Sequence, residues 1–417
     1  MKRFVLPLRH SRFRRVWYGQ AITSIGGGIF NVAMIGAVLL HHWYADLGFV
    51  LAAECAAMVV MSLLGGAITD RMREGQVMAL SEMIQFLAVL GFTLGVAGAP
   101  LPLILPFAAL MGAGQAVFQP AFGALIPSLV PDEDLSAANA LTSMTAKLGG
   151  FIGQAFGGLL LATSGYQVAL MVDLGTFAVS ILTAIGALIG LQEPVPERGE
   201  RESVFRDARA GLAAVRDRPW VLTVILQGTV QLLLVMGPAV VLLPILLKER
   251  GMFDAYGVIV GLEAAGFVIG GLAVSAWKPR RAGVVAVCAL SLLGLQLLAL
   301  LLELPVYVLG FTVLTTGFGY ALFRILWTSA VQRAFPDDLL GRALSVEMLG
   351  TFALAPVGLA LTPLAMNVVG DKAVLIAALV VLAVSTVIPL LQREVRMFGP
   401  GAPVRSGLVA VPAGDSA

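Results

Sequence analysis

The chain is 417 residues long, with 59% hydrophobic and 12% charged residues, two cysteines and a formal net charge of +2. Soluble globular domains contain roughly 45–50% apolar and about 25% charged residues. Such an apolar composition excludes a soluble enzyme and a disordered chain, and two cysteines exclude a disulfide-rich secreted module. The near balance of charge offers nucleic acid no basic face to bind.

Twelve apolar runs follow one another along the chain. Twelve membrane helices of about 20 residues need roughly 240 apolar positions, which this composition supplies. The runs are continuous rather than alternating, which indicates helices and not the strands of a barrel. They cover residues 16–40, 46–68, 76–97, 101–126, 137–163, 168–190, 220–247, 255–276, 283–303, 306–329, 344–367 and 371–391.

Two longer polar stretches divide the chain, and the first of them separates six runs from six. We therefore predict an all-α membrane protein with twelve transmembrane helices in two pseudo-symmetric six-helix bundles, residues 1–190 and 220–391. Residues 191–219 are expected to form a cytoplasmic linker, and residues 392–417 a disordered cytoplasmic tail.

The linker contains an amphipathic pattern. Apolar residues recur at helical spacing among arginines, which is typical of a helix at the membrane interface. These apolar positions are Val204, Ala208, Leu212 and Val215. We interpret this helix as a basic tether between the bundles.

Lysine and arginine are unevenly distributed between the two sides of the predicted helices. Of the 27 residues, 22 fall in segments that share one side, and only Lys248, Arg250 and Lys372 fall on the other. Lys147 and Arg324 lie within runs. Because basic residues are enriched in cytoplasmic loops, both termini and the linker are predicted to be cytoplasmic, in a multi-pass protein of the cytoplasmic membrane.

The two halves resemble each other at an offset of 205 residues. Gly65-Gly66 then aligns with Gly270-Gly271, and the glycines at 112 and 114 align with those at 317 and 319. Parallel six-helix halves of this kind occur in transporters that bind substrate between the halves and rock one against the other. The step from this architecture to transport is an inference, since a fold does not imply a function.

Several motifs resemble the major facilitator superfamily over residues 8–395, and more finely its branch of enterobactin exporters, macrolide efflux pumps and secretion effectors. They are the opening Leu8-Arg9, Phe13-Arg14, Trp17, Gly19-Gln20 and Ser24, the loop from Gly65 to Arg73, the stretch Pro131 to Leu135 with Ala138-Asn139-Ala140, and Pro336 with Gly341-Arg342. The resemblance implies a secondary transporter that exports a small amphipathic molecule, drug-, macrolide- or siderophore-like, in exchange for protons.

The sequence departs from the superfamily at the antiporter motif of the fifth helix. The glycines Gly149, Gly153, Gly157 and Gly158 are present, and their spacing allows another helix to pack closely. Gln154 replaces the proline of the motif. A proton-coupled symporter or facilitator for a nutrient or metabolite therefore remains an alternative, as does a non-transporting membrane sensor.

A cytoplasmic gate is expected at the loop after the second helix, where the superfamily motif lies. Asp70 can accept hydrogen bonds from exposed backbone donors, and arginines flank it. The gate is predicted to comprise Gly66, Asp70, Arg71, Arg73, Arg324 and Glu347, the last two having a structural role there rather than contacting substrate.

Charged residues inside membrane helices are costly and indicate function by default. We expect Glu54, Glu263 and Asp173 to be candidates for proton coupling, with Glu54 first because it has no obvious basic partner. Asp173 is expected near the outer surface, in contact with water. Helix positions predict an ion pair between Lys147 and Glu263 across the two halves, either coupled to transport or simply fixing the interface.

The resemblance implies a substrate cavity formed by the first, fourth, seventh and tenth helices. Amide and aromatic side chains on them suit a bulky amphipathic ligand: Asn31, Gln115, Phe118, Gln119, Gln227, Gln231, Phe323 and Trp327. No nucleophile motif, phosphate loop or metal-ligand spacing is found, so we expect no enzyme activity, cofactor or metal. The expected partners are a small-molecule substrate, protons and the lipid bilayer, with no nucleic acid, and the protein is expected to be a monomer.

Overall fold

The computed structural model describes residues 2–42, 44–69, 72–188, 204–277 and 279–397, and all structural statements refer to these. Every element in this part of the chain is a helix, which confirms the all-α prediction. The long apolar runs form helices because a chain in an apolar environment must satisfy its backbone hydrogen bonds internally.

The N-terminal half contains six long helices, most of which pack on α1 or on α4. Helices α5 and α6 pack on α1, while α2 and α3 pack on α4. The elements are η1 (Lys2–Arg9), α1 (Ser11–His41), α2 (Tyr44–Thr69), α3 (Glu74–Thr93), η2 (Val96–Gly98), α4 (Leu101–Leu129), α5 (Asp132–Ser164) and α6 (Tyr166–Leu188).

The C-terminal half is built mainly on α13, which packs against α10, α11 and α12. Its elements are α7 (Val204–Arg216), α8 (Pro219–Gln231), η3 (Leu232–Met236), α9 (Gly237–Glu249), η4 (Phe253–Ala255), α10 (Tyr256–Ala276), α11 (Ala282–Leu290), α12 (Leu293–Leu301), α13 (Val306–Ala334), α14 (Asp337–Phe352), α15 (Ala355–Val369), α16 (Asp371–Leu391) and α17 (Arg393–Arg396). The short η3 is a π-helical turn that joins α8 to α9.

Ten helical stretches in the described part of the chain are long and apolar enough to cross a membrane. Four of them combine consecutive elements, such as α8, η3 and α9. Helices α2 and α5, 26 and 33 residues long, are also long enough to cross a membrane. The structure thus agrees with the twelve predicted runs.

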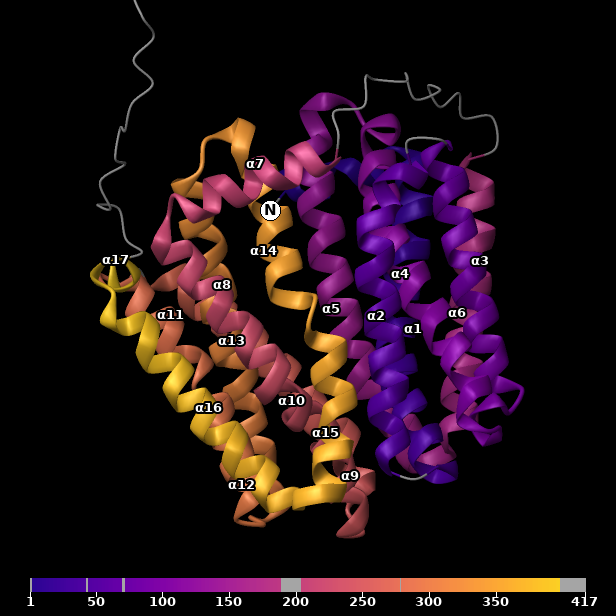
Figure 1. Ribbon diagram of the computed structural model, residues 1–417. Helices are drawn as coiled ribbons and strands as arrows, with labels where there is room; N and C mark the ends of the chain where they lie inside the picture. Colours follow the sequence, from indigo (N-terminus) through magenta and orange to yellow (C-terminus); the bar gives the residue numbers. More distant parts are fainter. Residues whose placement is uncertain (1, 43, 70–71, 189–203, 278, 398–417) are drawn as a thin grey trace, which may run out of the picture.

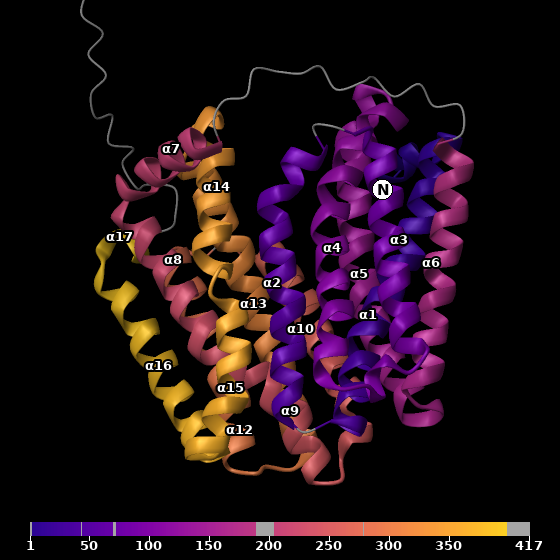
Figure 2. The same ribbon diagram turned by 45° about the vertical axis from the view of Figure 1, so that its right-hand side comes forward.

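The two halves lie side by side, and their helices end at two opposite ends of the molecule. We call the end that carries η1, α7 and α17 the terminal end, and the opposite one the far end (Figures 1 and 2). The amphipathic helix α7 lies at the terminal end and packs on α14, where Gly211 contacts the backbone of Arg342. Val215 of α7 is buried, whereas Leu212 is exposed.

The halves meet mainly through α2 with α15 and α5 with α10. In Figure 1 the C-terminal helices lean toward the N-terminal bundle at the far end, at the bottom of the view. There Gly158 of α5 lies against Gly257 of α10, and Gly48 of α2 lies against Pro363 of α15. Glycine permits backbone contact at these points because any Cβ would overlap the neighbouring helix.

The glycines of α5 divide between two partners. Gly149, Gly153 and Gly157 face α1, at Ser24, Ile25 and Ile29, whereas Gly158 faces α10 of the other half. One side of α5 is therefore packed within its own bundle, and the other side forms part of the contact between halves.

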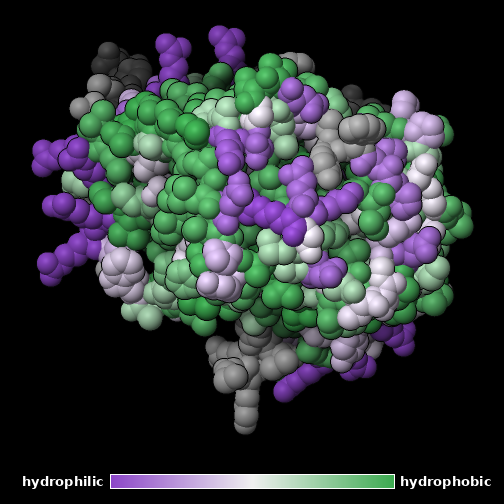
Figure 3. Space-filling view, turned by 90° about the horizontal axis from the view of Figure 1, so that it is seen from below, coloured by the Kyte–Doolittle hydropathy of each residue, from purple (hydrophilic) through white to green (hydrophobic). Residues whose placement is uncertain are grey.

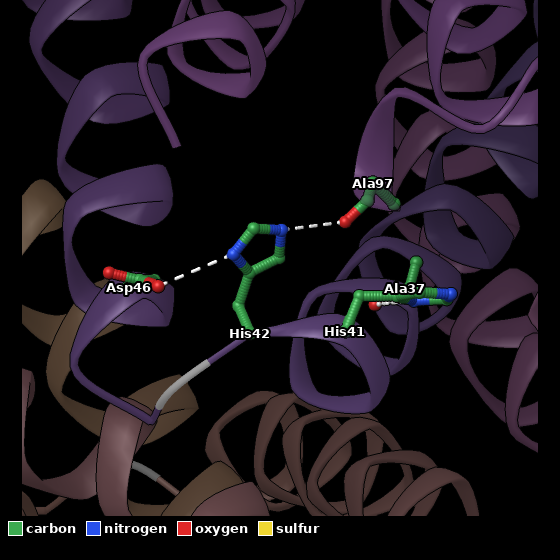
Figure 4. A network of polar contacts seen from close by, with 5 residues as sticks. All are labelled: Ala37, His41, His42, Asp46 and Ala97. Atoms are coloured by element: carbon green, nitrogen blue, oxygen red, sulfur yellow. Dashed lines mark hydrogen bonds and ion pairs between the residues drawn. The ribbon is translucent and has the colours of Figure 1, made fainter. Parts of the chain in front are cut away.

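Polar contacts join the elements at the far end. Lys248 at the end of α9 donates a hydrogen bond to the carbonyl of Leu39 in α1. His42, which follows α1, has Nε2 2.8 Å from the carbonyl of Ala97 and Nδ1 3.3 Å from the carboxylate of Asp46 (Figure 4). Seen from this end, hydrophilic side chains gather in the middle of a largely hydrophobic surface (Figure 3).

Candidate functional site

A cavity of about 230 Å3 lies between the two halves, and we call it the interdomain cavity. It is much larger than the roughly 30 Å3 that one water molecule occupies, so it can hold part of an organic molecule. Both halves contribute to its wall. Its polar lining residues are Asn31, Gln154, Tyr256, Glu263, Gln296 and Thr316.

A second cavity, of about 260 Å3, lies within the C-terminal half, and we call it the C-terminal cavity. It is lined by α8, η3, α10, α11, α12, α13 and α14. Glu263 and Thr316 belong to both walls, together with Met236 of the π-helical turn. The two cavities therefore adjoin at Glu263, the charged residue that they share.

Glu263 makes no hydrogen bond or ion pair with any described residue. The predicted pair with Lys147 is not formed. The Lys147 ammonium instead lies 5.9 Å from the ring centroid of Phe267, one turn along α10 from Glu263.

The register between α5 and α10 explains why this prediction was wrong. Gly158 lies against Gly257, and Ala155 lies against Gly261, so the helices run antiparallel with these residues level. Lys147 is then level with residues 268–269, and at 1.5 Å per residue it lies about 8 Å from the level of Glu263. Gln154 is the α5 side chain near that level, and it lines the same cavity.

Arg324, Trp327 and Glu347 form a polar cluster on the wall of the C-terminal cavity. Glu347 Oε1 accepts hydrogen bonds from Arg324 Nη1 at 3.4 Å and from Trp327 Nε1 at 3.2 Å. The ring of Phe323 stacks on Trp327, with centroids 6.2 Å apart and planes inclined by 6°. Arg324 and Glu347, which we expected at the gate, thus line a cavity.

The remaining gate residues lie elsewhere or outside the described residues. Asp70 and Arg71 belong to the part of the chain that the structure does not describe. Gly66 lies in the last turns of α2, and Arg73 is the exposed N-cap residue of α3 at the terminal end. The proposed gate therefore stays a prediction.

Glu54 and Glu263 occupy equivalent positions in the two halves. Gly112 of α4 lies against the backbone carbonyl of Glu54, and Gly317 of α13 lies against that of Glu263. The two glycines are 205 residues apart, as the sequence repeat predicts, but the two glutamates are 209 apart. Helices α2 and α10 are thus related with a shift of about one turn from the ungapped alignment. Glu54 lines neither cavity.

Asp173 is fully buried between α6 and α1, so the expectation that it contacts water was wrong. Its Oδ1 accepts a hydrogen bond from Thr176 at 3.1 Å, and Gly26 of α1 leaves space for both side chains.

Sequence reasoning missed Glu82 of α3, which is 1% exposed and accepts a hydrogen bond from Ser180. The signal was present, because Glu82 is a charge inside an apolar run.

Four of the eight predicted substrate-cavity residues line a cavity: Asn31, Gln231, Phe323 and Trp327. Gln119 is exposed, and Phe118 stacks on Phe122 in the core of the N-terminal half. Gln115 lines neither cavity, and Gln227 is buried without a hydrogen-bond partner in the described part of the chain. Helix number alone does not predict which face of a helix meets the cavity.

The sequence missed other cavity residues. Gln154 was visible only as a departure from a family motif, and Tyr256, Gln296, Tyr320 and Thr316 gave no signal that separates them from ordinary helix packing. Their shared property is position, since the cavity forms where helices from distant parts of the chain converge.

Comparison with known proteins places the chain in a family of transporters. The enterobactin exporter EntS of Shigella boydii serotype 18 is 29% identical over 373 residues, covering 85% of this chain and 87% of that protein. The EntS of Citrobacter koseri is 27% identical, covering 95% and 96%.

Solved structures share the fold. A bacterial homologue of the iron transporter ferroportin, in an inward-facing state, superposes with a TM-score of 0.70 at 18% identity, covering 91% of this chain and 98% of that one. The nucleoside transporter NupG does so with a TM-score of 0.60 at 14% identity, covering 94% and 98%. The model of the Major Facilitator Superfamily matches residues 16–359. The chain, a multi-pass membrane protein, therefore belongs to the Major Facilitator Superfamily of transporters.

Proposed function

We propose that this protein exports a small amphipathic molecule across the cytoplasmic membrane by alternating access, in exchange for protons. The observation that carries the proposal is the interdomain cavity, to which both halves contribute and whose one acidic side chain is Glu263. The halves meet at the far end. With the terminal end in the cytoplasm, as the basic residues predict, the structure is an inward-facing state.

The direction of transport is supported by the curated relatives, which are named enterobactin exporters. The cavity wall supports a ligand with apolar and polar parts, because it combines amides and a carboxyl with many apolar side chains. A siderophore-like or drug-like molecule fits this description, and a compact sugar or inorganic ion fits it less well.

Proton exchange needs a carboxyl that can gain and lose a proton during the cycle. Glu54, Glu263 and Asp173 all lie in spanning helices, and we place Glu54 first. It makes no ion pair or hydrogen bond with a described residue, and it is the equivalent of Glu263 in the other half. Asp173 is buried within one bundle, and its carboxylate already accepts a hydrogen bond from Thr176.

A second candidate function is a proton-coupled symporter or a facilitator for a nutrient or metabolite. Gln154 favours it, since this side chain stands where antiporters of the superfamily carry proline and lies on the cavity wall. A symporter or facilitator would bind its substrate in the same cavity from the outside and release it into the cytoplasm.

The test is transport by the purified protein in proteoliposomes, with radiolabelled enterobactin and the fluorescent cation ethidium as probes. We expect counterflow of at least one probe without a gradient, and accumulation when a pH gradient is imposed. Glu54→Gln should retain counterflow and reduce gradient-driven accumulation at least tenfold, because an amide cannot carry the proton. Glu303→Gln, in an exposed loop at the far end, should change neither.

The outcomes separate the candidates. Flux of neither probe under any gradient contradicts transport of this class and favours the sensor. Uptake together with protons indicates a symporter, and flux that only equilibrates indicates a facilitator. Unchanged accumulation by Glu54→Gln removes Glu54 as the proton carrier.

A further inference from the structure

Only three charged side chains line the two cavities in the described part of the chain: Glu263, Arg324 and Glu347. Arg324 and Glu347 form an ion pair with each other at 3.4 Å. When all three are ionised, their charges sum to one negative charge, which belongs to Glu263.

Among the residues that the structure describes, no basic side chain forms an ion pair with Glu263. The Lys147 ammonium is directed at the Phe267 ring, about 8 Å from the level of Glu263 along the helices. Arg324 lines the same cavity, but its guanidinium already pairs with Glu347. Burying a carboxylate in apolar surroundings costs free energy unless a positive group pairs with it. A cation that enters the cavity supplies this positive group, and its attraction to Glu263 favours binding.

Aromatic side chains line the C-terminal cavity together with this carboxylate. Phe323 and Trp327 stack on each other, and Tyr320 and Phe352 line the same wall. Trp327 uses its Nε1 to bind Glu347, so its ring presents carbon atoms rather than a polar group to the cavity. Aromatic ring faces attract a cation within about 6 Å, most strongly where water is excluded.

We propose that the joined cavities bind an organic cation with an apolar body, its charge beside Glu263 and its body against the aromatic wall formed by Tyr320, Phe323 and Trp327. This inference rests on the proposed function and names its substrate class. An organic anion of the same shape is excluded, because it meets an unpaired carboxylate and a guanidinium that is already neutralised.

Two ions of the same shape and opposite charge test the proposal. Binding of radiolabelled tetraphenylphosphonium and tetraphenylborate is measured on the full-length protein in lipid nanodiscs, with binding to empty nanodiscs subtracted. We expect saturable binding of the phosphonium only. Glu263→Gln should weaken it at least tenfold, a loss of about 1.4 kcal/mol.

Matched variants separate binding from folding. Glu82 is another buried glutamate in a spanning helix, and its side chain lines neither cavity. Glu82→Gln should therefore leave phosphonium binding unchanged. Glu263→Asp keeps the charge and should retain more affinity than Glu263→Gln. Should the glutamine variant fail to fold, the aspartate variant still gives a measurable shift, because its carboxylate is withdrawn from the cavity by one methylene group.

Several results would overturn the inference: equal binding of the borate, unchanged phosphonium affinity in Glu263→Gln, or no saturable phosphonium binding. Proteoliposomes distinguish this failure from failure of the proposed function. Counterflow of enterobactin without any binding of the phosphonium leaves export in place and removes the cation. Absence of flux for every probe removes the proposed function itself.

Discussion

At the scale of residues, Arg324, Trp327 and Glu347 form a hydrogen-bonded polar cluster in the C-terminal half. Glu347 is 8% exposed, and one of its oxygens accepts both hydrogen bonds. The Arg324 side chain is 44% exposed, so water screens part of its attraction to Glu347. The indole hydrogen bond is buried, so its loss costs more than the loss of a solvent-exposed hydrogen bond.

Glu347→Ala should therefore lower the stability by about 3 kcal/mol, since it removes both hydrogen bonds, one of which is buried. Glu347→Gln keeps an acceptor for Trp327 and should cost only about 1 kcal/mol. Thermal unfolding of the purified protein in detergent checks both variants. Equal effects of the two substitutions would contradict a role for the Trp327 hydrogen bond.

At the scale of elements, two helices at the far end stop in the same way with different residues. After α9, Gly251 donates to Lys248 and Met252 donates to Leu247, with Gly251 in the left-handed region at φ 67°. After α12, Glu303 donates to Leu300 and Leu304 donates to Ala299, with Glu303 at φ 54°.

This pair of hydrogen bonds is the Schellman motif, which favours glycine at the left-handed position. Glu303 is the one non-glycine residue at positive φ in the described part of the chain. It forms an ion pair with Lys372 at 3.0 Å, and the hydrogen bond from that ammonium lowers the pKa of the Glu303 carboxyl. The pair is thus formed at neutral pH and is lost as the pH falls through the lowered pKa.

Glu303→Gly should raise stability relative to Glu303→Ala by about 1 kcal/mol, because glycine has no Cβ to oppose the left-handed conformation. Both variants lose the exposed ion pair equally, so their difference reports on the backbone alone. Thermal unfolding at neutral pH measures it. No difference between the two variants would contradict strain at this helix end.

At the scale of the whole molecule, the far end is closed by helices that approach to backbone contact. Gly158 and Gly257 have no room for a Cβ, and neither backbone can yield without separating the two halves. Gly150, two turns away on α5, has open space where its Cβ would be. Replacing either glycine by alanine changes the helix propensity of α5 in the same way. Only the substitution at position 158 also disturbs the contact between the halves.

Gly158→Ala should shift the population toward a far-end-open state at least tenfold, whereas Gly150→Ala should not. Spin labels at Leu40→Cys of α1 and Val369→Cys of α15, both exposed at the far end, report the distance by double electron–electron resonance. Cys55 and Cys288 are replaced by serine in all variants. An unchanged distance distribution in Gly158→Ala would show that this contact does not control closure.

The fold was largely predictable, because each membrane helix is encoded locally by an apolar run of sufficient length. The candidate site was less so. Asn31, Gln231, Phe323 and Trp327 were correctly expected at a cavity, but the pair of Lys147 with Glu263 was not correct. Its failure follows from a register of α5 on α10 that a few glycine contacts set, and counting residues from helix ends does not reproduce it.

The sequence by itself determined that the protein is helical, crosses the membrane repeatedly and consists of two related halves. These properties depend on the length of apolar runs and on internal similarity, which are local or periodic. The tertiary structure alone decided which charges are neutralised. Arg324 pairs with Glu347 and Glu263 is left over, because side-chain partners depend on helix rotation and register at distances of a few ångströms.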